Sequence, residues 1–281
     1  MLFSPKISLV LGTLGRTEQL QFFLEKVSVQ SYANFEIIIV DQNIDDRVDK
    51  LLIDYIPRLA ITHLRAQPGL SKARNLGLKS CSGDIIAFPD DDCWYPPDLL
   101  ASVVKWLDSD FDGVTGRQLD AEGLDSGPIY DHVDGPVTLY NVWSRGISSS
   151  IFLKKQVVTA VGNFDETLGV GAGTDYGSGE ETDYLIRVVK NGFQLYYQPN
   201  LIVRHPASEQ IITPQMLART FSYGAGMGRV LRKHQYPLWF KARALARPLL
   251  GAAVALAKLN ILKARLHWTR CLGRRYGLSA H

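Results

Sequence analysis

The stretch ISLVLGTLGRTEQLQFFLEKVSVQSYANFEIIIVDQN (7–43) decides the fold. Its two ends, ISLVL (7–11) and FEIIIV (35–40), are short runs rich in β-branched residues, which is typical of buried strands. Between them, Leu20, Phe23, Leu24 and Val27 recur at helical spacing within residues 17–30. The stretch therefore predicts a strand, a helix and a second strand.

The alternation of strand and helix continues beyond residue 43. Helical patterns cover residues 47–55 and 71–80, and short apolar runs at 60–64 and 84–88 predict further strands. Alternation over about 90 residues predicts an α/β fold with a doubly wound, mainly parallel sheet, whose ligands bind beyond the carboxyl ends of the strands. Later strands are expected at 148–153, 194–197 and 201–204, later helices at 156–161 and 180–190, and a flexible loop at the five-glycine segment 169–179. Residues 111–145 follow no clear pattern.

Composition places the chain among ordinary globular proteins. Of its 281 residues, 46% are hydrophobic and 21% are charged, and the mean hydropathy is close to zero. These values exclude a disordered chain and a multi-span membrane protein, and the length allows one large domain or two smaller ones. The three cysteines lack the spacing of a disulfide framework or a zinc site, which indicates a reducing, cytoplasmic setting.

Charge is divided unevenly along the chain. Residues 1–209 carry 18 basic and 28 acidic side chains, whereas residues 210–281 carry 13 basic side chains and no acidic one. A basic tail of this kind predicts contact with an anionic surface, either a membrane or a nucleic acid. Its longest uncharged run, 248–257, has ten residues, which is too short for a bilayer, since a spanning helix needs roughly 20.

The tail also has the two-faced pattern of an interfacial helix. Leucines fall on one helical face and basic residues on the other: Leu245, Leu249, Leu256 and Leu259 against Arg243, Arg247, Lys258 and Arg265. This pattern favours a helix that lies on an anionic membrane surface. The alternative, in which the leucines pack on the protein's own core, stays open because most amphipathic helices do so.

Polar and acidic residues follow three of the predicted strands. Thr13 ends the first strand, Asp41 and Gln42 follow the second, and three consecutive aspartates (90–92) follow the strand DIIAF. Carboxylates this concentrated need a neutralising charge, which Mg²⁺ or Mn²⁺ would supply while also binding a diphosphate. The alternative is a solvated acidic turn that caps the next helix. Arg74, in the preceding helix, is placed either to face a pyrophosphate or to lie on the helix surface.

A second acidic group, Glu180, Glu181 and Asp183, begins the helix predicted after the glycine-rich segment. Acids in a first helical turn are stabilised by the helix dipole, and Asp183 is spaced to pair with Arg187. A carboxylate beside a flexible loop is also placed to take the proton from a hydroxyl. His205 follows a predicted strand and is therefore a candidate metal ligand.

Taken together, these motifs resemble those of the family 2 glycosyltransferases, which are inverting enzymes with the GT-A fold. The most specific similarity is PGLSKARNLGLKSCSGDIIAFPDDDCW (68–94), which looks like the family's ARN and DXD block. TLGR (13–16) is similar to the family's TYNR segment, SVQSYANFEIIIVDQN (28–43) looks like its nucleotide-contacting turn, and GEETDYLIRVVKNGF (179–193) looks like its ED-x-D-L helix. The resemblance covers roughly residues 5–205.

The resemblance implies a Rossmann-like, mainly parallel mixed sheet flanked by helices, followed here by a helical basic extension. The implied nucleotide contacts are Thr13, Arg16, Asp41, Gln42, Arg74 and Asp91. The implied ligands of Mn²⁺ or Mg²⁺ are Asp90, Asp92 and His205, and the implied general base is Glu181, with Glu180 and Asp183 on the acceptor side. The implied reaction is direct displacement, in which an acceptor hydroxyl attacks the anomeric carbon of a nucleotide sugar as the nucleoside diphosphate leaves.

Three positions depart from the family pattern. Gln42 stands where a second acidic residue often contacts uracil, Glu181 replaces the commoner Asp, and Gly15 replaces the Asn of TYNR. These changes leave dTDP- and GDP-sugars open beside the favoured UDP-sugar donor. With the basic tail, the resemblance predicts a cytoplasmic enzyme, peripheral on the inner face of the plasma membrane, that acts on a lipid-linked or glycan acceptor.

The predicted domains are a catalytic domain at residues 1–209, with a nucleotide-binding half at about 1–110 and an acceptor half at about 111–209, and a helical tail at 210–281. Two other functions stay open. A sugar nucleotidyltransferase shares this architecture and the need for a metal, but residues 12–16 lack the lysine expected in its phosphate loop. A nucleic-acid-binding protein would use the basic tail, but the acidic first 209 residues would repel phosphate, so no nucleic-acid partner is expected.

Overall fold

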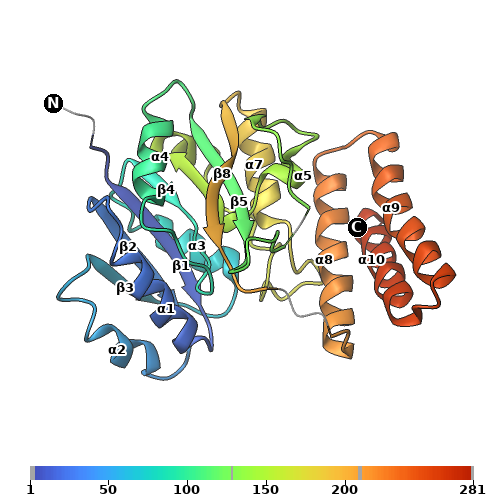
Figure 1. The fold of residues 1–281 in the computed structure, drawn as a ribbon, viewed down its shortest axis with the longest axis horizontal. Helices are drawn as coiled ribbons and strands as arrows, with labels where there is room; N and C mark the ends of the chain where they lie inside the picture. Colours follow the sequence, from blue (N-terminus) through green and yellow to red (C-terminus); the bar gives the residue numbers. More distant parts are fainter. Residues whose placement is uncertain (1–3, 128, 208–210, 280–281) are drawn as a thin grey trace. The chain divides into compact units, whose positions relative to one another are not determined.

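The computed structural model describes residues 4–127, 129–207 and 211–279. The chain forms two compact units, and both can be followed by residue colour in Figure 1. The first comprises residues 1–68, 72–164 and 184–208, and the second comprises residues 69–71, 165–183 and 209–281. The second unit thus combines the basic tail with residues 165–183, which the predicted division assigned to the acceptor half.

The first unit is built on a mixed sheet with the strand order β3-β2-β1-β4-β7-β5-β8-β6. The strands are β1 (Ile7–Thr13), β2 (Phe35–Asp41), β3 (Ile61–Arg65), β4 (Ile85–Ala87), β5 (Gly113–Leu119), β6 (Gly135–Pro136), β7 (Ile151–Lys154) and β8 (Leu195–Arg204). Neighbours from β3 to β4 are parallel, as are β5 and β8, whereas β7 is antiparallel to β4 and β5, and β6 to β8. The predicted α/β fold with a mainly parallel mixed sheet is confirmed.

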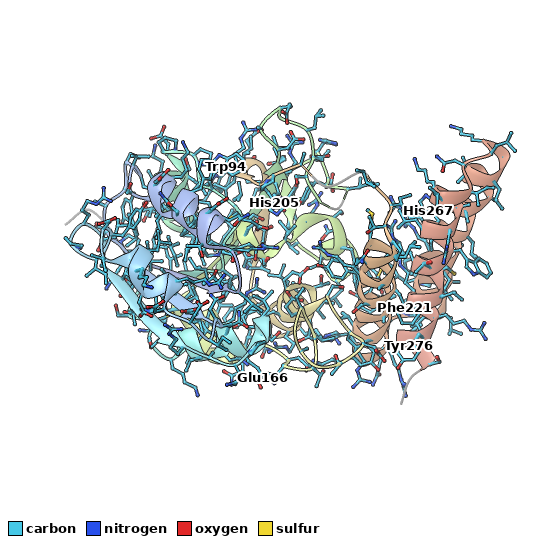
Figure 2. The ribbon with its side chains drawn as sticks, turned by 90° about the horizontal axis from the view of Figure 1, so that it is seen from below. Trp94, Glu166, His205, Phe221, His267 and Tyr276 are labelled. Atoms are coloured by element: carbon cyan, nitrogen blue, oxygen red, sulfur yellow. The ribbon has the colours of Figure 1, made fainter. Side chains whose placement is uncertain are left out.

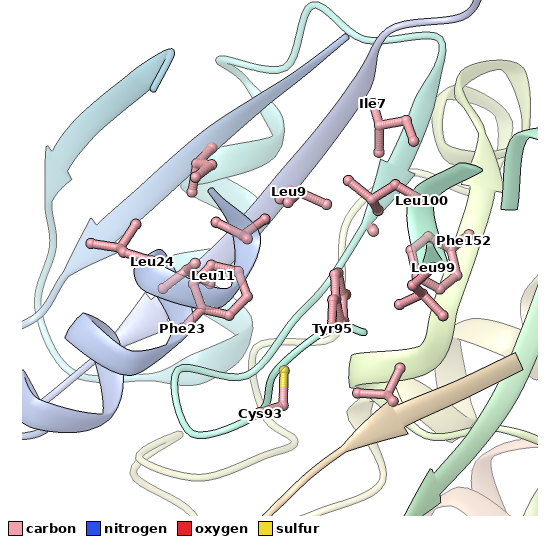
Figure 3. Packing of buried hydrophobic residues seen from close by; sticks show 14 of the residues in the cluster. Ile7, Leu9, Leu11, Phe23, Leu24, Cys93, Tyr95, Leu99, Leu100 and Phe152 are labelled. Atoms are coloured by element: carbon pink, nitrogen blue, oxygen red, sulfur yellow. The ribbon is translucent and has the colours of Figure 1, made fainter. Parts of the chain in front are cut away.

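Helices cover both faces of the β1–β2 region because successive side chains of a strand point to opposite faces. Before β8 the chain forms helices α1 (Thr17–Val27), α2 (Arg47–Leu52), α3 (Leu70–Leu78), α4 (Leu99–Leu107), α5 (Val142–Arg145), α6 (Lys155–Val161) and α7 (Glu180–Lys190), and the first residues of α3 and α7 belong to the second unit. Buried residues of α1, α2 and α4 share one core cluster with alternate residues of β1 and β2, part of which Figure 3 shows. Helix α3 packs on the other face, where a Cβ on Gly77 would lie 2.5 Å from the side chain of Val10.

Two of the later strands differ from the predicted pattern. The predicted strand 148–153 begins with a 3₁₀ turn, Ser148–Ser150, before β7. The two strands predicted at 194–197 and 201–204 form the single strand β8, although QPN (198–200) interrupts the apolar pattern. The register of β8 against β5 shifts next to Gly116, and a Cβ there would lie 2.0 Å from the carbonyl oxygen of Leu201. This bulge lets one strand pass through a polar segment.

The second unit contains helices α8 (Pro214–Lys233), α9 (Leu238–Ala257) and α10 (Ile261–Ser279). Glycines on α10 allow its backbone to approach that of α8 closely. A Cβ on Gly277 would lie 2.0 Å from the carbonyl oxygen of Ala225, and one on Gly273 would lie 2.2 Å from that of Phe221. In Figure 2, Phe221 of α8 and Tyr276 of α10 face each other, and their ring centroids are 5.6 Å apart.

The tail is helical, as predicted, but its leucines are not the packing face. Helix α9 ends at Ala257, and Leu259 lies in the turn before α10 with a φ of 55°. Mostly small residues form the buried side of α9: Phe240, Ala244, Pro248, Ala252 and Ala255. Leu249, Leu256 and Leu259 are 40%, 56% and 89% exposed, so the alternative that they pack on the protein's own core is wrong. None of the described helices is both long enough and apolar enough to cross a membrane.

Candidate active site

The carboxyl ends of β1, β2 and β4 lie side by side because these strands are parallel neighbours. Thr13 and Asp41 are paired in register at the ends of β1 and β2, and the backbone N–H of Gln42 donates to the carbonyl oxygen of Thr13 at 2.9 Å. All three residues are buried. The structure therefore brings together the polar residues that the sequence places after the first two strands.

Two arginines face the acidic turn that follows β4. Nη1 of Arg16 lies 2.9 Å from Oδ1 of Asp91, and the same atom forms an ion pair with Asp92. Nη2 of Arg74 lies 3.1 Å from Oδ1 of Asp90. Arg74 is completely buried, so the alternative that it lies on the helix surface is wrong.

His205 is held beside the same turn by the end of β8. The backbones of Trp94 and Arg204 exchange two hydrogen bonds, of 2.8 and 2.9 Å, and Trp94 and His205 are labelled in Figure 2. Nε2 of His205 lies 3.3 Å from Oδ1 of Asp92, and its Nδ1 lies 2.8 Å from the carbonyl oxygen of Pro206. The backbone pairing thus places an imidazole against the acidic turn.

The three residues predicted as metal ligands all lie at or beside the acidic turn. Asp92 and His205 are in contact, whereas Asp90 contacts Arg74 and also accepts a hydrogen bond of 3.1 Å from Oγ of Ser148. Within the described residues, no three His, Cys, Asp or Glu side chains are grouped as a metal site.

Burial and charge shift the pKa values of the acidic turn in different directions. Burial raises the pKa of Asp91 to about 6, although Arg16 and Thr13 oppose the change. Burial also opposes ionisation of Asp92, but His205 and Arg16 outweigh it and lower the pKa of Asp92. For His205, burial disfavours the charged form, but the hydrogen bond to Asp92 outweighs it and raises the pKa. Within the turn, buried negative charge is therefore incompletely neutralised at Asp91, whereas His205 and Arg16 stabilise the charge of Asp92.

The raised pKa of Asp91 predicts a pH-dependent cost to stability. The pKa is higher in the folded protein, about 6, than the usual 3.8, so the stability that Asp91 contributes is present below about pH 4 and lost as the pH rises through 6. We expect Asp91→Asn to raise the free energy of unfolding at pH 8 by on the order of 2–3 kcal/mol and to change it little at pH 4. Urea denaturation at both pH values measures this difference, with the exposed Asp110→Asn as control. An equal change at the two pH values would contradict the prediction.

Asp41 has two basic neighbours that the sequence analysis missed. Its carboxylate Oδ2 lies 3.3 Å from Nε2 of His63 and 3.1 Å from Nη1 of Arg65, while Oδ1 accepts hydrogen bonds of 2.8 and 2.7 Å from the backbone and side chain of Asn43. His63 and Arg65 lie two residues apart on β3, in register with Ile39 and Asp41. Their alternate spacing within a strand was the available signal, because it places both on one face of the sheet.

The second acidic group begins helix α7 in the second unit. Glu180 and Asp183 are buried, and Glu181 is half-buried. Burial raises the pKa of Tyr223 of α8, and the negative charges of the two glutamates add to this change. Asp183 pairs with Lys233 and His234, while Arg187 donates to the carbonyl oxygens of Val161 and Asn163. Asp183 and Arg187 thus each have partners besides the one that their helical spacing predicts.

Residues 169–179, expected as a flexible loop, are joined to neighbouring segments of the second unit. The hydroxyl of Thr174 donates to the carbonyl oxygen of Thr167 at 2.7 Å, and the hydroxyl of Tyr276 donates to Oδ2 of Asp175 at 2.7 Å. The guanidinium of Arg229 lies 5.6 Å from the ring centre of Tyr176. These contacts connect the glycine-rich segment with α8 and α10.

Comparison of the sequence with known proteins identifies glycosyltransferases as its relatives. A family model described as glycosyl transferase family 2 matches residues 8–158. Glycosyltransferase AglE of Haloferax volcanii is 24% identical over 243 residues, which are 80% of this chain and 74% of AglE. An uncharacterized glycosyltransferase of Bacillus subtilis, YwdF, is 35% identical over 105 residues, which are 37% of this chain and 39% of YwdF.

Solved structures share the fold at low sequence identity. The mannosyltransferase PcManGT of Pyrobaculum calidifontis, solved with GDP-Man and Mn²⁺, superposes with a TM-score of 0.66 and 15% identity over 98% of this chain and 88% of its own. S. aureus TarS, solved with UDP-GlcNAc, superposes with a TM-score of 0.60 and 15% identity over 94% of this chain and 91% of its own. With the family match over more than half of its residues, the chain belongs to glycosyl transferase family 2 and has the GT-A fold.

Proposed function

We propose that this protein is a metal-dependent, inverting hexosyltransferase that moves a sugar from a nucleotide-sugar donor to a hydroxyl of a lipid-linked or glycan acceptor. The observation that supports this most is the cluster at the strand ends of the first unit, where Arg16, Arg74 and His205 face the acidic turn. Guanidinium groups suit a diphosphate and carboxylates suit a hard divalent cation. A nucleotide-sugar donor, whose diphosphate also binds a divalent cation, therefore suits this cluster.

The proposed nucleotide contacts follow the carboxyl ends of β1, β2 and β4. Thr13, Asp41 and Gln42 end neighbouring strands, and in the proposal they face the nucleoside. Arg16 and Arg74 are the proposed diphosphate contacts, because both guanidinium groups lie at the acidic turn, where the cation is also proposed to bind. A UDP-sugar stays the favoured donor and GDP- and dTDP-sugars the alternatives, since the structural relatives include one solved with UDP-GlcNAc and one solved with GDP-Man.

A divalent cation, Mn²⁺ or Mg²⁺, fits Asp92 and His205. When Nδ1–H of His205 donates to the carbonyl oxygen of Pro206, the neutral imidazole presents the lone pair of Nε2 towards Asp92. Asp90 is the third proposed ligand. Because burial raises the pKa of Asp91 despite Arg16, the turn would gain from further positive charge. A cation held there would neutralise charge on the leaving diphosphate.

In the proposed reaction, Glu181 is the general base. It takes the proton of the acceptor hydroxyl, whose oxygen forms a bond to the anomeric carbon while the bond from that carbon to the diphosphate oxygen breaks. A single displacement from the opposite side inverts the configuration of that carbon. Arg16 and Arg74 remain with the departing nucleoside diphosphate and stabilise its charge. Glu180 and Asp183 are the proposed acceptor-side neighbours of Glu181.

Metal-dependent nucleotide binding tests this proposal directly. UDP, dTDP, GDP and CMP are each added with and without Mn²⁺, and the melting temperature is measured, because a ligand that binds the native state raises it. A metal-dependent rise with one nucleoside diphosphate supports the class and identifies the base of the donor. No rise with any of the four would contradict the proposal.

The exposed side of α9 and α10 supports an anionic membrane as a partner. Large apolar side chains are exposed on these helices and in the turn between them, among them Leu250 at 67%, Leu259 at 89%, Ile261 at 72%, Leu262 at 56% and Trp268 at 53%. Exposed basic residues accompany them: Arg243, Arg247, Lys258, Lys263 and Arg265. Apolar side chains with a basic surround suit the interface of an anionic bilayer. We therefore propose peripheral attachment at the cytoplasmic face of the plasma membrane, where a lipid-linked acceptor would be within reach.

The triple change Leu250→Ser, Leu262→Ser and Trp268→Ser is expected to weaken binding to vesicles of phosphatidylglycerol and phosphatidylcholine. Burying one such side chain fully is worth about 1.5–3 kcal/mol, so partial burial of three predicts a loss of at least ~10-fold. Co-sedimentation measures it, with Ile56→Ser, an equally exposed site on the first unit, as control. Equal sedimentation of the triple variant and the parent would contradict the membrane contact.

A further inference from the structure

The end of helix α8 holds the first turn of helix α7 within the second unit. Oδ1 of Asp183 lies 2.8 Å from Nε2 of His234 and 2.7 Å from Nζ of Lys233. Lys233 is the last residue of α8, and His234 follows it directly. Asp183, one of the three acidic residues that begin α7, is thus paired with Lys233 and His234 of the basic tail.

Burial makes this contact energetically important. The side chain of Asp183 is completely buried, that of His234 is 6% exposed and that of Lys233 is 31% exposed. Removal of a partner from a buried carboxylate leaves its charge uncompensated.

Nζ of Lys233 also lies 2.7 Å from Oδ2 of Asp165. Burial opposes ionisation of Asp165, but Lys233 and Thr167 outweigh it and lower its pKa. Lys233 therefore bridges two carboxylates from separate segments.

The segment that leads into α7 is bound to the same helix. The backbone N–H of Gly177 donates to Oγ of Ser222 at 2.9 Å, and Oγ of Ser178 donates to the carbonyl oxygen of Tyr223 at 3.0 Å. A Cβ on Gly226 would lie 2.1 Å from the carbonyl oxygen of Ser178, so α8 and this segment touch through their backbones. Helix α8 therefore contacts both the first turn of α7 and the segment that precedes it.

We propose that Lys233 and His234 are positioning residues that orient Glu181 through Asp183. This inference rests on the proposed function, in which Glu181 is the general base. Glu181 and Asp183 lie two residues apart in one helical turn, so holding the buried carboxylate fixes the tilt and rotation of that turn. A displacement of about 1 Å at a reacting group can cost ~100-fold in rate. The basic tail is then part of the catalytic apparatus as well as a membrane contact.

The test uses the full chain and needs no acceptor other than water. Release of the nucleoside diphosphate from GDP-mannose and from UDP-GlcNAc is measured with Mn²⁺ for the parent, Asp183→Asn and Lys233→Met. We expect kcat to fall by ~10- to 100-fold in both variants while the KM for the donor changes by less than about threefold. The conservative variants Lys233→Arg and His234→Gln keep a donor to Asp183 and are expected to stay within about threefold of the parent.

Hydrogen exchange gives a readout that does not depend on turnover. In Asp183→Asn, the amides of residues 180–186 are expected to exchange at least ~10-fold faster than in the parent, because the first turn of α7 loses its anchor. Lys105→Met removes an exposed lysine of α4 and is expected to leave both kcat and this exchange unchanged. It controls for the loss of one surface charge.

Distinct results would overturn the inference and the proposed function. Variants that are folded, judged by their melting curves, and that keep the parental kcat would show that Asp183 does not position the base. A rise in KM at constant kcat would assign the contact to donor binding and also overturn the inference. If the parent neither binds any of the four nucleotides with Mn²⁺ nor hydrolyses either donor, the proposed function fails. In that case unchanged exchange in Asp183→Asn would overturn the anchoring contact, and faster exchange would support it.

Discussion

Asp92→Ala is expected to abolish the metal-dependent rise in melting temperature with a nucleoside diphosphate and to lower the transfer rate by at least ~10³-fold. The carboxylate of Asp92 contacts both His205 and Arg16, so its loss removes a proposed metal ligand and the partner of the imidazole at once. Without a cation on the diphosphate, the leaving group departs with uncompensated charge. Thermal-shift titrations and product formation with the identified donor measure the two effects.

The matched control for this change is Asp108→Ala, which removes an exposed carboxylate beyond α4 and is expected to alter neither quantity. Asp92→Asn separates charge from size, because the amide keeps the shape but not the charge. If the metal-dependent shift persisted in Asp92→Ala, residues other than Asp92 would hold the metal. Parental transfer in the absence of any divalent cation would show that the reaction does not need one.

Glu181→Gln is expected to keep metal-dependent nucleotide binding and to lower kcat for transfer by ~10²- to 10⁴-fold, the range that a positioned general base contributes. The amide has nearly the same size as the carboxylate but cannot take a proton. Glu181 is not among the residues proposed to contact the nucleotide or the metal, and the substitution keeps the size of its side chain. Nucleotide affinity should therefore change little. Thermal shift and initial rates at saturating donor measure the two quantities.

Glu166→Gln is a suitable control, because it removes a carboxylate from the same unit at a position without a proposed role. Its transfer rate is expected to match that of the parent. Transfer by Glu181→Gln near the parental rate would require another base, and Glu180 would be the next residue to change. Loss of nucleotide binding in Glu181→Gln would instead mean that the change disturbs the donor site.

Much of the fold could be predicted from local patterns. The first two strands and the intervening helix agree with ISLVL, FEIIIV and the spacing of Leu20 and Phe23, because burial on one face imposes a regular period on the sequence. The region 111–145 could not be assigned, since β5 is rich in glycine and polar residues and pairs with β7 and β8. Its strand character arises from pairing with distant segments rather than from its own composition.

The candidate site was predictable in part for the same reason. Parallel neighbours deliver Thr13, Asp41 and the acidic turn to one edge of the sheet, so the position of each at a strand end was informative. The placement of His205 against Asp92 depends on the backbone pairing of Trp94 with Arg204. That pairing joins residues far apart in sequence and has no local signal.

The sequence by itself determined the α/β alternation, the acidic residues at the strand ends, the acidic first turn of α7 and the excess positive charge of the tail, because each is a property of neighbouring residues. Only the tertiary structure decided which groups meet. It placed His63 and Arg65 against Asp41, turned the alanine side of α9 inward and left Leu249, Leu250 and Leu256 exposed, and paired Asp183 with Lys233 and His234. These contacts depend on strand order and on how closely helices approach, which are set by packing across the whole unit rather than by any single segment.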